Sequence, residues 1–294
     1  MARITTYPAI TSAQGTTNLA DSDVFILDGD GGSRKITAKE LATASADKLM
    51  QYTSSIPAGK SGLYRGASLG SGSTFAAAST SAQKAAIANG SFDGLFIGDY
   101  WTIGGRVYRI ADFNYWKRTG DTDFNTNHIV IVPDASFGSG PMNDTNDTTG
   151  AYVGSKMYTD ESSVLNTARS TVSDHFGGYL ASHKIYLPNA TSSGAESAGA
   201  WVASTVDLMN ELMVYGHFIR TAPTGTSYLI TTEKSQLALF RLNPAMINLR
   251  YTYWLRNVAS ATNFALVLND GRAHTNDASN SYGVRPAFAV KGTA

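Results

Sequence analysis

The 294-residue chain contains no cysteine. It therefore forms no disulfide bond, offers no thiolate to a metal ion and carries no cysteine nucleophile. Disulfide-dependent scaffolds, zinc-finger-like sites and cysteine-based enzymes are excluded.

Charge is also scarce and balanced. Only 16% of the residues are charged, and 23 Lys and Arg residues offset 23 Asp and Glu residues. A chain without net charge exerts no long-range attraction on a phosphate backbone or on anionic headgroups. We therefore expect no nucleic-acid partner and no binding to a membrane surface.

Long apolar runs are missing as well. The N-terminal stretch MARITTYPAITSA lacks the apolar centre of a signal peptide. No later segment approaches the roughly 20 apolar residues of a membrane-spanning helix. We expect a protein that is made in a cytoplasm, does not insert into a membrane, and leaves the cell by a route other than secretion.

Small, hydrogen-bonding and aromatic residues take the place of charge, with 28 Gly and 15 Tyr. Tyr offers rigid contact area, whereas Ser, Asn and Gly offer adaptable hydrogen bonds, a combination typical of recognition surfaces. The apolar fraction of 43% suffices for a substantial core. The composition favours a β-rich globular protein that binds something.

Residues 1–60 form the first predicted unit. VFILD at 24–28 predicts a strand, DGDGGS predicts a turn, and RKI predicts a second extended segment. Thr37 and Glu40 have the spacing of a capping box for a helix over 38–51. The stretch SSIPAGKSG then interrupts the pattern, so a small N-terminal module is expected to end there.

Residues 61–294 alternate between strand and helix patterns, which predicts an α+β domain. Gly104-Gly105 between alternating apolar residues predicts a tight hairpin, and HIVIVP predicts a buried strand. The stretch over 160–178 predicts an amphipathic helix. Its inward-facing residues are expected to be Val164, Leu165, Ala168, Val172 and Phe176.

A further helix is predicted from Ser204 to Gly216, where Ser204 serves as the cap and Gly216 ends the helix. Asp207 and Glu211 would then lie four residues apart on one helical face. Such a pair usually marks a solvated face and not an acid–base pair.

Motif-like stretches elsewhere lack the context that their chemistry requires. Gly59–Ser61 resembles the end of a phosphate-binding loop, and Ser68 in GASLG resembles a nucleophile elbow, but neither has the required strand and helix. DGDGGS has Lys39 where a calcium loop needs Glu. His175 and His183 have no metal-ligand spacing. The sequence predicts no enzyme activity, no cofactor and no metal site.

The C-terminal region carries the clearest likeness. YWLRNVAS at 253–260, followed by GVRPAF at 283–288 with polar alternation between them, resembles C-type-lectin-fold proteins of bacteriophages, including the variable proteins of diversity-generating retroelements. The stretches GDYWTIGGRVYRIADF, HIVIVPD, GAYVGSKMY, VDLMNELMVYG and EKSQLALF extend the resemblance over residues 61–294.

This resemblance implies two helices packed on a twisted antiparallel sheet. It also implies a framework of the WLR and GVRP strands, with a ligand-display segment over about 254–288 that matches a host receptor. We expect the framework residues to hold a rigid two-strand scaffold. These residues are Trp254, Leu255, Val284, Pro286 and Phe288.

Residues 1–45 are similar to the start of phage fibre and appendage proteins. The likeness is carried by ITSAQGTTNLADSDVFILDGDGGSRKITAKELA. It implies a module that anchors a homotrimer to other virion proteins, so that the protein is exposed on the surface of the particle.

Polar residues between the two framework segments are the candidate contacts to a host-surface protein or glycan, because they suit exposed hydrogen bonding and stacking. The candidates are Asn257, Thr262, Asn263, Leu268, Asn269, Asp270, Arg272, His274, Asn276, Asn280 and Tyr282. Two alternatives stay open: a structural head-decoration or fibre protein without a specific receptor, and a tailspike-type hydrolase that uses Ser68 or a carboxylate pair.

Overall fold

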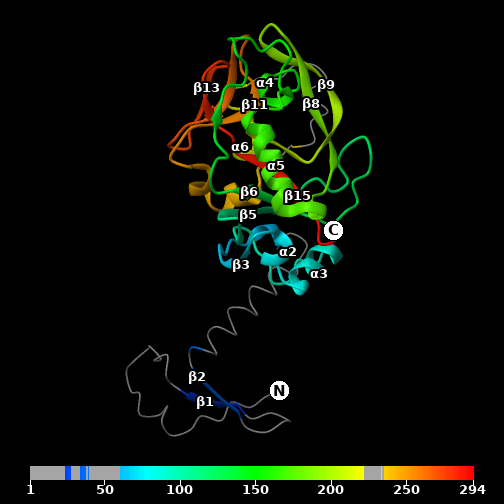
Figure 1. Cartoon of the computed structure of the whole chain (residues 1–294). Helices are drawn as coiled ribbons and strands as arrows, with labels where there is room; N and C mark the ends of the chain where they lie inside the picture. Colours follow the sequence, from blue (N-terminus) through cyan, green and yellow to red (C-terminus); the bar gives the residue numbers. More distant parts are fainter. Residues whose placement is uncertain (1–23, 28–33, 38, 40–59, 222–232, 234) are drawn as a thin grey trace, which may run out of the picture. The chain divides into compact units, whose positions relative to one another are not determined.

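The computed structural model describes residues 24–27, 34–37, 39, 60–221, 233 and 235–294. Packing divides the chain into two units, Met1–Gly59 and Lys60–Ala294. In the first unit, β1 (Val24–Leu27) and β2 (Arg34–Thr37) pair antiparallel (Figure 1). The helix predicted over 38–51 lies outside the described residues, except for Lys39.

A six-stranded sheet in the second unit has the order β10–β15–β6–β5–β4–β3. All neighbouring strands are antiparallel except β3 and β4, which are parallel. The strands are β3 (Ser68–Gly72), β4 (Tyr100–Ile103), β5 (Arg106–Phe113), β6 (Ile129–Pro133), β10 (Val206–Leu208) and β15 (Pro286–Val290).

Two sequence predictions for this sheet are confirmed. Gly104 and Gly105, with φ of 54° and 79°, form the turn between β4 and β5, where a tight hairpin needs residues that tolerate positive φ. Strand β6 is buried along its whole length.

A second sheet has five strands in the order β13–β12–β11–β14–β7. Strand β14 pairs parallel with β11, and the other pairs are antiparallel. The strands are β7 (Ser139–Gly140), β11 (Tyr253–Val258), β12 (Asn263–Val267), β13 (Ala273–Asp277) and β14 (Tyr282–Gly283).

The framework residues lie in two different sheets. Trp254 and Leu255 lie in β11 of the five-stranded sheet, whereas Pro286 and Phe288 lie in β15 of the six-stranded sheet. The chain passes from β14 to β15 through Val284 and Arg285 only, so GVRPAF starts beside β11, where Gly283 pairs with Tyr253, and continues into the six-stranded sheet.

Among the described residues, the helices are short apart from one. They are η2 (Lys60–Gly62), α2 (Phe75–Ala78), α3 (Ser81–Asn89), α4 (Lys156–Thr159), α5 (Val164–Phe176), η3 (Gly177–Tyr179), α6 (Glu211–Tyr215), α8 (Ala238–Leu242) and η4 (Pro244–Ile247). Helix α5 confirms the predicted amphipathic helix: the Ser163 hydroxyl caps it, and four of the five expected residues are buried, with Val164 partly exposed.

Helix α5 packs against β10 and β15. Figure 1 shows β3, α2 and α3 at one end of this unit and β11 and β13 at the other. A hairpin of two ten-residue strands, β8 (His183–Ser192) and β9 (Ala195–Ser204), completes the unit. Strands β11 and β13, which carry the candidates Asn257, His274 and Asn276, therefore lie at the end opposite to β3.

The helix predicted from Ser204 to Gly216 is mostly wrong. Val206–Leu208 form strand β10, and the helix begins only at Glu211, with Asn210 as its cap. Gly216 does end it, with φ of 82°. The periodic pattern failed because β10 gains its hydrogen bonds from β15, a partner that is distant in sequence.

Both sheets contribute to one apolar core. Trp101 and Tyr108 from the six-stranded sheet and Trp254 and Phe264 from the five-stranded sheet are fully buried in it, together with Phe176 of α5. The fold is mixed α+β and mostly sheet. In the part of the chain that the structure describes, none of the helices has the length and apolarity of a membrane span.

Candidate ligand-binding surface

Strand β13 lies at an edge of the five-stranded sheet, and the turn that leads into it carries four candidate residues. Asp270 and Arg272 form an ion pair of 2.7 Å with side chains that are 47% and 76% exposed. The backbone N–H and the side chain of Arg272 lower the pKa of Asp270, so this carboxylate is charged. Asn269 is exposed and Leu268 is half-buried. The turn is a fixed polar projection at the surface.

Asn276, Asn280 and Tyr282 form a hydrogen-bonded chain. The Asn276 amide donates to the Tyr282 hydroxyl at 2.5 Å, and the Asn280 amide donates to the Asn276 carbonyl at 2.8 Å. Asn280 is exposed and the other two are half-buried. The structure thus joins three candidates that come from β13, β14 and the loop between them.

His274, Thr262 and Asn263 lie on the same sheet. His274 is exposed on β13 opposite Leu266, and Asn263 lies opposite Asp277. The Thr262 hydroxyl donates to the Asn263 side chain at 2.5 Å. All but one of the candidates are therefore at least partly accessible, distributed over β12, β13, β14 and the turns next to these strands.

Asn257 is the exception and is a correction. Its side chain is 4% exposed. Its carbonyl oxygen accepts the Glu211 backbone N–H at 2.8 Å, and its amide donates to Glu196 at 3.3 Å. A ligand on the surface does not reach it, so Asn257 holds α6 and β9 in place beneath the sheet.

Two buried residues hold the surface from below. The Trp254 indole donates to the Gly140 carbonyl at 2.9 Å and so ties β11 to β7. The Arg285 guanidinium donates to the carbonyls of Pro133 and Met246, each at 2.9 Å. Side chains held this way keep the surface rigid, which lowers the entropy that a ligand-binding surface loses on association.

An open hollow of about 490 Å³ adjoins Tyr282. We call it the Tyr282 hollow. It is lined by Ser139, Arg250, Tyr251, Thr252, Asn269, Ser281 and Tyr282. It brings together the candidates Asn269 and Tyr282, which are 13 residues apart in the sequence.

Sequence analysis missed Arg250 and Tyr251 at this hollow. They lie before YWLRNVAS at 253–260 and so outside the display segment expected over about 254–288. A cation and an aromatic ring beside Tyr282 give the hollow hydrogen-bond donors and flat apolar faces, which are the groups that hold a polar ligand in place.

Three acidic side chains are buried in the second unit. Burial raises the pKa of Glu196 to about 7, against the opposing hydrogen bond from the Val258 backbone N–H. Glu211 is fully buried and accepts the Thr221 hydroxyl at 2.6 Å. Asp207 is 5% exposed and pairs with Arg169 at 2.8 Å. The solvated helical face predicted for Asp207 and Glu211 is therefore wrong.

Residues 162–292 match a family model described as a domain of unknown function (DUF6273). No curated protein and no solved structure matches the chain. The matched segment begins just before α5 and includes all the candidate ligand residues. It completes neither sheet by itself, because β15 pairs with β6 and β14 pairs with β7, both of which lie before residue 162.

The motif-like stretches do not have the local structure that their catalytic or phosphate-binding roles require. Ser68 begins β3 and is not at a strand-to-helix turn, and Lys60 and Ser61 lie in the short η2. His175 shares a 2.8 Å hydrogen bond with Tyr108, and His183 packs against Trp116. Among the described residues, no group of three or more His, Asp or Glu side chains is arranged to hold a metal ion.

Proposed function

We propose that the protein is a phage virion appendage that binds a host-surface ligand through the end of its second unit that carries β11, β12 and β13. The observation that carries this proposal is the chain of Asn276, Asn280 and Tyr282 beside the Tyr282 hollow. Polar groups that are accessible, mutually bonded and fixed on buried Trp254 are suited to recognition.

The finer fold proposal is a C-type-lectin fold for residues 61–294. The mixed α+β architecture, with α5 packed on a sheet that contains the C-terminal strand β15, is compatible with it. The passage from the display strands into β15 through Arg285 also accords with the framework role that the resemblance implies for GVRP.

The anchoring proposal concerns residues 1–60. This segment carries six basic and six acidic residues and is too short to bury enough surface to be stable alone, so we propose that three copies complete it and attach to other virion proteins. Light scattering of the full-length chain at micromolar concentration tests this: a trimer supports it, and a monomer overturns it.

The virion assignment has a direct test. Gold-labelled antibodies against the chain, applied to intact particles and viewed by electron microscopy, should mark the outer surface of the particle. Labelling that appears only after the particles are disrupted would overturn the surface location. Sequencing the neighbouring DNA adds the test for diversification: a reverse transcriptase with an adenine-rich copy of the segment 254–288 is the expected result.

Receptor binding is tested separately with the soluble protein. Fluorescently labelled full-length chain should stain cells of the phage's own bacterial host and not cells of a resistant derivative. Equal staining of both would leave the structural-decoration alternative, in which the fold stabilises the particle and contacts no receptor.

A further inference from the structure

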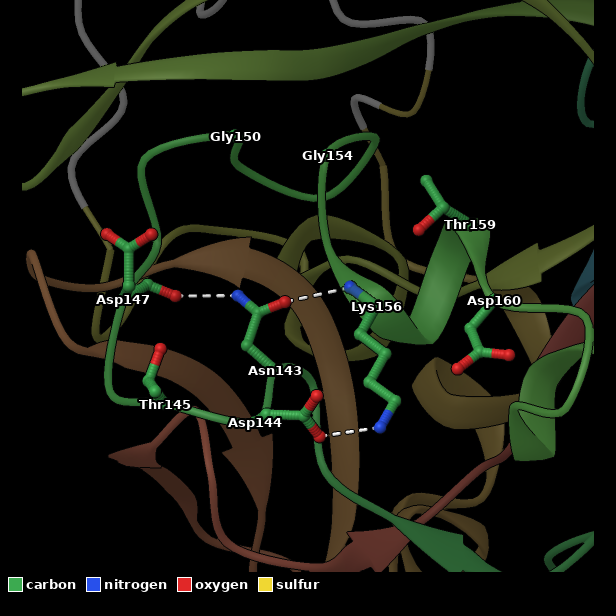
Figure 2. Close-up of a pocket in the computed structure, with 9 residues that line it drawn as sticks. All are labelled: Asn143, Asp144, Thr145, Asp147, Gly150, Gly154, Lys156, Thr159 and Asp160. Atoms are coloured by element: carbon green, nitrogen blue, oxygen red, sulfur yellow. Dashed lines mark hydrogen bonds and ion pairs between the residues drawn. The ribbon is translucent and has the colours of Figure 1, made fainter.

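An open hollow of about 540 Å³ lies along residues 143–160 (Figure 2). It is lined by Asn143, Asp144, Thr145, Asp147, Gly150, Gly154, Lys156, Thr159 and Asp160. Figure 2 shows the Asn143 amide donating to the Asp147 carbonyl and the Lys156 ammonium beside Asp144. These groups are bonded to one another within one surface segment, so the hollow gives no indication of a ligand.

A buried aromatic cluster of the second unit contains two histidines. Residues 114–128 connect β5 to β6, and we call them the β5–β6 loop. The centre of the Trp116 ring system in this loop lies 6.1 Å from that of His128 and 4.2 Å from that of His183, and Phe124 packs against both imidazoles. His128 is fully buried and His183 is 5% exposed. Because His183 begins β8, the cluster joins the loop to the β8–β9 hairpin.

The hydrogen bonds of His128 require its neutral form. The Trp116 backbone N–H donates to His128 Nε2 at 3.2 Å, so this nitrogen carries no proton. Nδ1 lies 2.9 Å from the Thr126 carbonyl, which only accepts, so Nδ1 is the protonated nitrogen. A second proton would place a hydrogen atom on Nε2 that faces the Trp116 N–H. Two donors would then oppose each other, and the bond would be lost.

His183 has no acceptor for a second proton either. Its Nδ1 lies 3.4 Å from the Ala181 carbonyl, and its buried Nε2 has no hydrogen-bond partner among the residues that the structure describes. A charged imidazole there would be a buried cation with an unpaired donor, which is costly. Burial accordingly lowers the pKa of both histidines, that of His128 to about 4.

Neighbouring charges also disfavour an imidazolium at His128. Lys117 and His183 each lower the pKa of His128 by repulsion. Lys117 is fixed in this position because its ammonium donates to the Asn127 side chain. A proton on His128 would therefore be repelled by Lys117 and by any positive charge on His183.

The carboxylates that face His183 are already paired. Glu233 and Asp207 favour a positive charge on His183, whereas Arg256 disfavours it. Glu233 pairs with Arg256 at 2.7 Å, and Asp207 pairs with Arg169 at 2.8 Å. Burial outweighs the attraction of these carboxylates, so the pKa of His183 is lowered as well.

Trp116 is a buried anchor of a strained loop. Its indole N–H donates to buried Glu233 at 2.8 Å, in addition to its backbone bond to His128. Arg118 adopts a φ of 59°, which is unfavourable for a residue with a Cβ and persists only where the surroundings hold it. A second tie to β8 is the pair of Asp121 with Lys184 at 3.5 Å, whose side chains are 34% and 44% exposed. An ion pair at the surface contributes little, so Trp116 matters more.

We propose that the β5–β6 loop is an acid-sensitive latch, in which protonation of His128 detaches Trp116 and releases the loop from the β8–β9 hairpin while the two sheets stay folded. The inference is independent of the proposed receptor binding. Once the loop is released, both imidazoles reach water and can hold protons. The base of the loop stays in place, because the Asn114 backbone N–H donates to the His128 carbonyl at 2.9 Å and continues the pairing of β5 with β6.

Hydrogen exchange of the full-length chain tests this, read by mass spectrometry and corrected for the intrinsic pH dependence of amide exchange. The closed loop is fully stabilised above about pH 6.5, the ordinary pKa of histidine, and loses stability as the pH falls toward about 4. Protection of peptides within residues 115–127 should therefore fall on the order of a hundredfold between pH 7 and pH 4. Protection of β5 and β6 should persist. Unchanged protection over 115–127, or an equal loss in both sheets, would overturn the inference.

A matched pair of variants identifies the group that titrates. His128→Gln keeps a side-chain oxygen that can accept the Trp116 N–H but cannot be protonated in this pH range, so its loop should stay protected at pH 4. The control His217→Gln removes an exposed histidine outside the cluster and should lose protection like wild type. Loss of protection in His128→Gln at the wild-type pH would assign the effect to carboxylates such as Asp121 or Glu233 and would contradict the role of His128.

The wild-type chain decides the question if His128→Gln does not fold at pH 7. NMR of protein labelled with ¹³C-histidine follows the protonation of His128 directly. Its midpoint should coincide with the loss of protection over residues 115–127. A difference of more than about one pH unit between the two midpoints would show that another group opens the loop.

Discussion

The Tyr282 ring packs edge-on against the Trp254 indole, with ring centroids 5.0 Å apart and planes at 78°. Tyr282 is half-buried and lines a hollow, whereas Trp254 is fully buried. The pair joins the accessible surface to the core, so the position of Tyr282 depends on a residue that no ligand touches.

This relationship predicts that Trp254→Ala damages folding more than binding chemistry. Loss of a fully buried indole and of its bond to Gly140 should lower the free energy of unfolding by about 3–5 kcal/mol. Urea unfolding measures this, with Tyr282→Phe as the control that keeps the ring and should stay within about 1 kcal/mol of wild type. A Trp254→Ala protein of unchanged stability that fails to bind host cells would move Trp254 into the site.

Arg285 should also prove structural. The residue is 1% exposed, and its guanidinium donates to the Pro133 and Met246 carbonyls and lies 5.4 Å from the centres of the Phe240 and Tyr253 rings. Arg285→Ala leaves these carbonyls without a donor and should lower stability by roughly 2–4 kcal/mol. Arg285→Lys should not restore it, because an ammonium lacks the planar fork. Full rescue by Lys in urea unfolding would contradict this role.

Glu196 should make stability depend on pH. Its folded-state pKa is raised from the ordinary 4.5 to about 7, so the folded protein binds more protons than the unfolded chain between these values. Its contribution is therefore fully present below about pH 4.5 and is lost as the pH rises through about 7.

The measurement is the difference in unfolding free energy between Glu196→Gln and wild type from pH 4.5 to 8.5. As the pH rises, the unfolding free energy of the variant should increase relative to that of wild type by up to about 3 kcal/mol. Taking the difference removes the opposite trend from His128, whose pKa burial lowers to about 4. A flat difference across this range would show that Glu196 does not titrate as its burial implies.

Local signals in the sequence predicted the elements that local chemistry decides. Gly104-Gly105 marked its hairpin because positive φ restricts the choice of residue, and α5 followed from its apolar spacing. The solvated helical face predicted for Asp207 and Glu211 was wrong because their partners Arg169 and Thr221 lie 38 and 10 residues away. The helical spacing of apolar residues does not indicate that Val206–Leu208 form a strand, because that strand pairs with β15 near the C-terminus.

The candidate ligand residues likewise include some whose exposure was predicted correctly and one whose exposure was not. Polar residues in the turns around β13 are accessible, as their composition indicated, whereas Asn257 is held by Glu196 and Glu211 from other elements. The Tyr282 hollow also escaped prediction, because its walls come from segments more than 100 residues apart, such as Ser139 and Tyr282.

The second unit should fold without the first if the truncation is placed correctly. The Ser61 hydroxyl donates to buried Asp112 at 2.7 Å, and Arg241 donates to the Ser61 carbonyl at 2.9 Å. A chain beginning at Lys60 should unfold cooperatively. One beginning at Gly62 should be about 1–3 kcal/mol less stable, since Asp112 loses a partner. Loss of the near-UV circular dichroism from the chain that begins at Lys60 would contradict the boundary between the two units.

The central claim is that the face with β13 and Tyr282 recognises the host, and adsorption of assembled particles tests it most directly. The test variant combines His274→Ala, Asn280→Ala and Tyr282→Phe, and the matched control combines Ser170→Ala, Ser173→Ala and Asp174→Ala on the exposed side of α5. With both proteins folded and incorporated equally, the test particles should adsorb to host cells at least about tenfold more slowly than wild type, and the control particles at the wild-type rate. Equal adsorption by all three particles would contradict recognition by this face and favour a purely structural decoration.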